Sequence, residues 1–133
     1  MVDTWQPADQ KAEISSEKLL GYASLISSQE TVQEEIVSLE KADIDLVNNY
    51  LNMPQEAWLK AIENFTDAQV LNLCMFFTVG EMKFPTWTFG SKNPTIYFLR
   101  HLKSEKRAAE KEFIRWLKKQ TDNRYIPYGP AIL

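Results

Sequence analysis

The sequence predicts an all-α fold: a compact single-domain bundle of about five to seven helices with an irregular C-terminal tail. Apolar residues recur at helical spacing in successive segments of the chain. We find no run of alternating apolar and polar residues beside an Asn-Gly or Asp-Gly turn, the pattern typical of paired strands. The length of 133 residues indicates one domain, large enough to bury a core without metals or disulfides.

The N-terminal half begins with an arm and then two or three helices. Residues 1–11 contain Pro7 and are expected to form a loose arm. The first helix is predicted from Ser15 or Ser16 to about Ser27, with an apolar stripe of Leu19, Tyr22, Ala23 and Ile26. Ser28 is the expected N-cap of the next helix. Two further stripes follow, and periodicity leaves open whether they form one bent helix or two: Val32, Ile36 and Leu39, then Ile44, Val47 and Leu51.

The middle of the chain carries the clearest helix signals. Pro54 suits a first helical turn, where its missing N–H costs nothing, and the helix after it would bury Trp58, Leu59, Ile62 and Phe65. Thr66 and Gln69 then have the capping-box spacing. In the helix that they open, eight of the ten residues from Val70 to Val79 are apolar, so we expect other helices to surround it. Gly80 offers a left-handed end, although the helix can continue to Lys83.

The C-terminal half is predicted to hold a loop, two helices and a tail. Residues 84–91 form the one long loop, with Pro85 and Gly90 as breakers. Asn93 and Pro94 start a helix with Ile96, Leu99 and Leu102 on its buried face. Ser104 is expected to cap the last helix, about 105–120. Its predicted buried face is Ala109, Phe113, Trp116 and Leu117, and residues 121–133 are expected to be a non-helical tail.

The residue inventory argues against several classes of site. The chain has one cysteine, Cys74, and one histidine, His101, so it lacks the ligands of a zinc site and cannot form an intrachain disulfide. Cys74 lies in the most apolar segment and is expected to be an inert core thiol. The four glycines are too dispersed for a phosphate-binding loop. We therefore assign no catalytic residue, cofactor or metal ligand, and an enzyme whose site is assembled only in space is the third hypothesis.

Three further observations predict the compartment. No apolar segment approaches the roughly 20 residues of a membrane span, and the N-terminus lacks the basic and apolar regions of a secretory signal. A single cysteine fits a reducing environment. We expect a cytoplasmic protein that does not enter the membrane.

Charge is divided unevenly along the chain. Residues 1–66 hold 4 basic and 12 acidic residues, a net charge of −8, whereas residues 67–133 hold 11 and 6, a net charge of +5. If the last helix is continuous, one of its faces carries a basic stripe of Arg107, Lys111, Arg115 and Lys118. This stripe could contact phosphates or be a solvated face. A third interpretation is that the acidic half docks on it, in the same chain or in a partner.

Aromatic residues outside the helices are the second candidate surface. They are Phe84, Trp87 and Phe89 in the loop, and Tyr125 and Tyr128 in the tail. Such residues can anchor a partner, or they can be lids that close the core, which is the interpretation we favour. The first functional hypothesis is a non-enzymatic protein-interaction or regulatory module that binds another protein or a second copy of itself. The alternative is an RNA- or DNA-binding module that uses the basic last helix.

Overall fold

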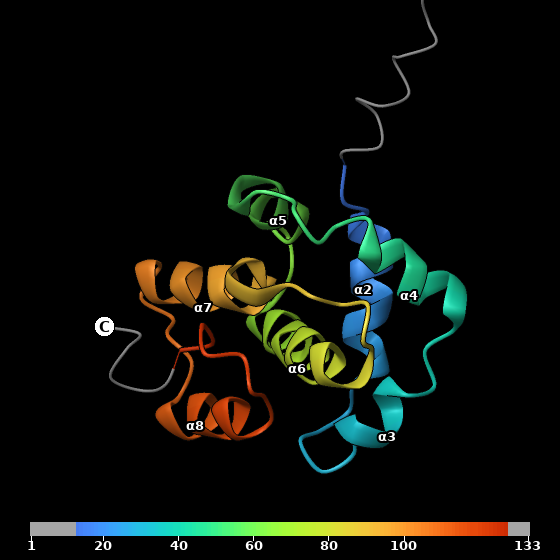
Figure 1. The fold of residues 1–133 in the computed structure, drawn as a ribbon. Coiled ribbons are helices and arrows are strands. Elements are labelled where there is room, and N and C mark those ends of the chain that lie inside the picture. Colours follow the sequence, from blue (N-terminus) through green and yellow to red (C-terminus); the bar gives the residue numbers. More distant parts are fainter. Residues whose placement is uncertain (1–12, 128–133) are drawn as a thin grey trace, which may run out of the picture.

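The fold is an all-α bundle, as the sequence predicts. The computed structural model describes residues 13–127, and in this part of the chain it contains seven α-helices, one 3-10 helix and no strand (Figure 1). The expected N-terminal arm and the last part of the tail lie outside the described residues. The elements are α2 (Ser16–Leu25), α3 (Val32–Ile36), α4 (Lys41–Asn48), α5 (Gln55–Ala61), α6 (Asp67–Lys83), η2 (Gly90–Lys92), α7 (Pro94–Ser104) and α8 (Lys111–Lys119).

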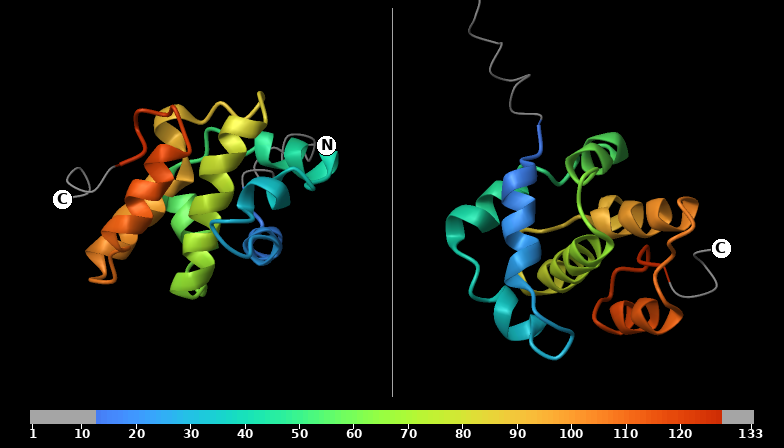
Figure 2. Two further views of the ribbon diagram at one scale, coloured as in Figure 1. Left: turned by 90° about the horizontal axis from the view of Figure 1, so that it is seen from below. Right: turned by 180° about the vertical axis from the view of Figure 1, so that it is seen from behind.

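Helix α6 is the centre of the bundle. It packs against α2, α3, α7 and α8, and α5 packs on α7. Figures 1 and 2 show α2, α3 and α4 on one side of α6, with α7 and α8 on the other. The predicted capping box is present: the Thr66 hydroxyl accepts from the Gln69 amide at 3.2 Å, and the Gln69 side chain accepts from the Thr66 amide at 2.9 Å. The run of buried residues from Leu73 to Gly80 confirms that this helix is enclosed.

Buried polar groups hold α7 against α6. Asn93 caps α7, because its side-chain oxygen accepts from the Thr95 amide at 2.9 Å. The Thr95 hydroxyl donates to the Cys74 carbonyl at 3.1 Å and lies 3.0 Å from the hydroxyl of Thr78. An unpaired polar group in such a place would cost about 1–3 kcal/mol, so these bonds set the register of the two helices.

The second helical region is two helices rather than one bent helix. Helices α3 and α4 are separate, with four residues between them. The predicted N-cap of this region was wrong: the N-cap of α3 is Thr31 and not Ser28. Instead the Ser28 carbonyl accepts from the amide of Val32 at 3.0 Å, inside the turn that precedes the helix.

The last helix is shorter than predicted. It begins at Lys111 and not near residue 105, so the predicted start was wrong. Ser104 does not cap it: this residue ends α7, and its hydroxyl donates to the His101 carbonyl at 2.7 Å. Ile114 and Leu117 are the buried residues of α8, whereas three of the four predicted core residues are half-buried, namely Ala109, Phe113 and Trp116.

A Schellman motif separates α7 from α8. The Arg107 amide donates to the Leu102 carbonyl at 2.8 Å, and the Lys106 amide donates to the Lys103 carbonyl at 3.0 Å. Lys106 adopts the left-handed conformation that this motif requires, with a φ of 63°. The chain therefore turns at Lys106, and α8 begins only at Lys111, because its N-cap residue Glu110 has an extended backbone with a ψ of 148°.

Gly80 lies inside α6 rather than at its end. The helix continues to Lys83, and the indole of Trp87 lies on the bare backbone of Gly80. A Cβ at position 80 would stand 2.3 Å from Cζ3 of Trp87, closer than real contacts allow. The glycine therefore admits the tryptophan ring to the surface of the central helix.

Substitution of this glycine should destabilise the fold, although alanine is the better helix former. Gly80→Ala is expected to lower the free energy of unfolding by roughly 1–3 kcal/mol, because Trp87 must move. Gly21→Ala is the matched control in α2, where nothing lies within 4 Å of the added Cβ. That change should raise the free energy of unfolding by roughly 0.5–1 kcal/mol. Urea denaturation measures both, and equal effects of the two variants would contradict the packing of Trp87 on Gly80.

Candidate functional site

The aromatic loop closes the core. Trp87 and Phe89 are 1% and 4% exposed, and the half-buried Phe84 packs edge-on against Trp87 with ring centroids 4.8 Å apart. The indole N–H of Trp87 donates to the Ile44 carbonyl at 3.1 Å, which ties the loop to α4. In this conformation the loop is the lid that the sequence left as one of two alternatives, and Trp87 and Phe89 present no exposed ring to a partner.

The first part of the tail is held to the body of the protein. The Asn123 side chain donates to a Glu81 oxygen and to the Gly90 carbonyl, both at 2.9 Å. The Lys118 ammonium donates to the carbonyls of Asn123 and Ile126 at 3.1 and 2.9 Å. Ile126 is 1% exposed, so this tail segment ends in a core contact.

A groove lies beside this tail segment. It has a volume of about 350 Å³ and is lined by Glu81, Met82, Gly90 and residues 121–125, a set that we call the tail groove. Tyr125 and Met82 are 48% and 46% exposed, and the guanidinium of Arg124 lies 5.2 Å from the centre of the Tyr125 ring. Tyr125 is thus the exposed member of the aromatic candidates. Tyr128 lies outside the described residues.

Glu81 joins three segments, and no sequence pattern had indicated it. Its two carboxylate oxygens accept hydrogen bonds from the Gly90 amide, the Asn93 side chain and the Asn123 side chain, each at 2.9 Å. These donors come from η2, the cap of α7 and the tail. The carboxylate is therefore the point at which the end of α6 holds the loop and the tail together.

The four predicted basic residues do not form one helical stripe. Lys111 and Arg115 are exposed on α8, whereas Arg107 precedes the helix and forms an ion pair with Asp67 at the start of α6. Lys118 is half-buried, and its ammonium binds the tail carbonyls. Two of the four, Lys111 and Arg115, thus point their charge toward solvent from one helix.

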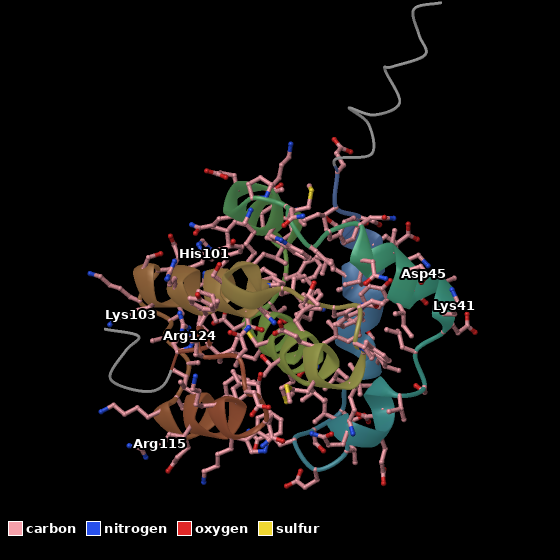
Figure 3. The ribbon with its side chains drawn as sticks, in the orientation of Figure 1. Lys41, Asp45, His101, Lys103, Arg115 and Arg124 are labelled. Carbon is pink, nitrogen blue, oxygen red and sulfur yellow. The ribbon has the colours of Figure 1, made fainter. Side chains whose placement is uncertain are left out.

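The cations of α7 and α8 lie together on one side of the molecule, whereas the other side carries mostly carboxylates, with Lys18 and Lys41 among them. In Figure 3, His101, Lys103, Arg115 and Arg124 lie at one side of the molecule, and Lys41 and Asp45 lie at the other. The basic flank is defined here as the cations of α7, α8 and their adjoining segments: Arg100, Lys103, Lys106, Arg107, Lys111, Arg115, Lys118, Lys119 and Arg124. The acidic flank is the set of carboxylates on α2, α3, α4 and the turn before α3: Glu17, Glu30, Glu34, Glu35, Asp43 and Asp45, with Glu40 just before α4.

Burial raises the pKa of two core side chains, Cys74 and Tyr22. Burial alone raises the pKa of the Cys74 thiol well above its ordinary value. Burial also raises the pKa of the Tyr22 hydroxyl, and the hydrogen bond that this hydroxyl donates to Asp43 at 2.8 Å adds to the effect. Among residues 13–127 we find no cluster of three or more His, Cys, Asp and Glu residues that could hold a metal ion.

No described helix is both long and apolar enough to cross a membrane. Comparison of the chain with protein-family models, with curated proteins and with solved structures finds no match.

Proposed function

We propose that the protein is a helical protein-interaction module whose basic flank binds an acidic surface of a partner protein. The observation that carries this proposal is the gathering of cations on α7, α8 and their adjoining segments, on the side of α6 away from α2 and α4. Charge gathered on one side of a molecule creates a field that attracts an oppositely charged partner and orients it during association.

The composition around the basic flank favours a protein over a nucleic acid. Glu105, Glu110 and Glu112 stand among the cations, and the whole chain carries a net charge of −3, whereas a nucleic-acid-binding domain is typically strongly basic. The tail groove adds exposed side chains of Met82 and Tyr125, with Arg124 beside them. Methionine, tyrosine and arginine are enriched in protein interfaces, where the apolar body of each side chain is buried and its charge or hydroxyl is paired.

A charge reversal on α8 should weaken binding of an acidic peptide. The probe is a fluorescein-labelled peptide of Asp, Glu and Leu, with labelled mixed-sequence RNA and DNA as comparison probes, all followed by fluorescence polarisation. Lys111→Glu combined with Arg115→Glu is expected to weaken peptide binding roughly tenfold or more, since two of the three exposed cations of α8 become repulsive. The peptide is expected to bind more weakly as salt rises.

The control makes the same change in net charge on other helices. Lys41→Glu with Lys60→Glu alters α4 and α5, where both lysines are exposed, and should leave peptide binding close to that of the unchanged protein. Tighter binding of RNA or DNA than of the peptide would replace this proposal with the nucleic-acid alternative. Failure to bind any probe at low salt would mean that the basic flank is a solvated face.

A further inference from the structure

A cleft opens on the acidic flank between α2 and the segment that joins α3 to α4. Its volume is about 520 Å³. Three carboxylates stand on its rim, and two leucines are among its apolar lining residues: Glu17, Glu40 and Asp43, with Leu25 and Leu39. We call this the acidic cleft. An apolar slot with a negative rim suits a long cationic side chain, whose methylene stem can pack on the leucines while its head meets the carboxylates.

Two of the three carboxylates on the rim of the acidic cleft are exposed to solvent. Asp43 accepts from the Tyr22 hydroxyl at 2.8 Å and from the Lys18 ammonium at 3.3 Å, so its position is fixed from within the chain. Glu17 and Glu40 are exposed, one on each wall. The rim therefore keeps an excess of negative charge even with Lys18 in place.

Helix α8 carries exposed cations that complement the carboxylates of the acidic cleft. Lys111, Arg115 and Lys119 are exposed on this helix, with a single acidic residue, Glu112, inside it. The acidic cleft and α8 of one molecule cannot meet, because α2 and α4, which help to line the cleft, lie on the other side of α6 from α8 (Figures 1 and 2). Docking of the acidic half on the basic helix within one chain is thereby excluded for these two surfaces.

We infer that the partner is a second copy of this chain, whose α8 cations enter the acidic cleft of the first. The inference rests on the proposed function, because it names the acidic surface that the basic flank binds. Every copy carries both halves of the contact, so the same pairing can repeat from one molecule to the next. This is a head-to-tail association, in which two different surfaces meet.

Sedimentation velocity of the full chain tests the pairing. The average mass of the unchanged protein should rise with concentration at about 0.01 M ionic strength and fall to that of a monomer at about 1 M, where the Debye length shrinks from roughly 30 Å to roughly 3 Å. Arg115→Glu and Glu40→Lys, each alone, should weaken association roughly tenfold. An equal mixture of these two variants should recover a dimer, since one keeps an intact cleft and the other an intact α8.

Matched controls carry the same charge changes away from both surfaces. Lys60→Glu and Glu63→Lys alter exposed residues in or just after α5 and should associate like the unchanged protein. A chain that stays monomeric at low ionic strength, or a mixture of variants that fails to recover the dimer, overturns the inference. Binding of the acidic peptide is measured separately from self-association. A chain that binds the peptide but stays monomeric would keep the proposed function and lose this inference. A chain that does not bind the peptide would lose the proposed function itself.

Discussion

Trp87→Ala is expected to lower the free energy of unfolding by about 3–5 kcal/mol, the range for deleting a fully buried aromatic side chain. The ring lies against Phe76, Phe77, Phe84 and Phe89. Its loss also leaves the Ile44 carbonyl without the indole donor. Urea denaturation followed by circular dichroism measures the effect, which should appear as a lower midpoint of unfolding.

Two further variants make this result specific. Tyr125→Ala removes an aromatic side chain that is 48% exposed, and should change stability by less than about 0.5 kcal/mol, as exposed positions usually do. In the Trp87→Ala background, the penalty of Gly80→Ala should disappear, because the clashing ring is gone. A Trp87→Ala protein of unchanged stability would mean that the loop is not the lid of the core.

Glu81→Ala is expected to cost roughly 2–3 kcal/mol of stability, since three N–H donors lose their charged acceptor. The donors are Gly90, Asn93 and Asn123. Besides the lower overall stability, we expect a local effect: the backbone amides of Gly90 and of the tail segment should exchange hydrogen faster. Hydrogen exchange with mass spectrometry reads the local effect, and urea denaturation reads the total.

Asp122→Ala provides the control for Glu81→Ala. It removes an exposed carboxylate from the same tail groove, and should change stability by less than about 0.5 kcal/mol. If the two variants proved equally mild, Glu81 would not be the point that holds the loop and tail to α6.

Signals confined to a few neighbouring residues were predictable from the sequence. Thr66 and Gln69 stand three positions apart, and Asn93 is next to Pro94, so both helix starts were predicted correctly. The start of α8 was predicted wrongly, because the turn before it places Lys106 in a left-handed conformation. Glycine is the residue that usually marks such a helix end in a sequence. With no glycine there, the apolar spacing and Ser104 predicted a helix about two turns too long.

The candidate site depends on contacts that no local pattern encodes. The unequal charges of the two halves were visible in the sequence, but the placement of α2 and α4 across α6 from α7 and α8 required the fold. Glu81 meets Asn123 from 42 positions away, and Gly80 matters because of a ring seven residues later in the chain. These two contacts form only when the loop and the tail fold back onto α6.

The buried cysteine is a natural probe of how often the helix bundle opens. Cys74 carries the only thiol of the chain and is fully buried in α6, and its carbonyl is bonded to Thr95 of α7. An alkylating reagent can reach its sulfur only after helices move away from α6. The rate at which the native protein consumes such a reagent therefore reports how often the helices around α6 move apart, without any added label.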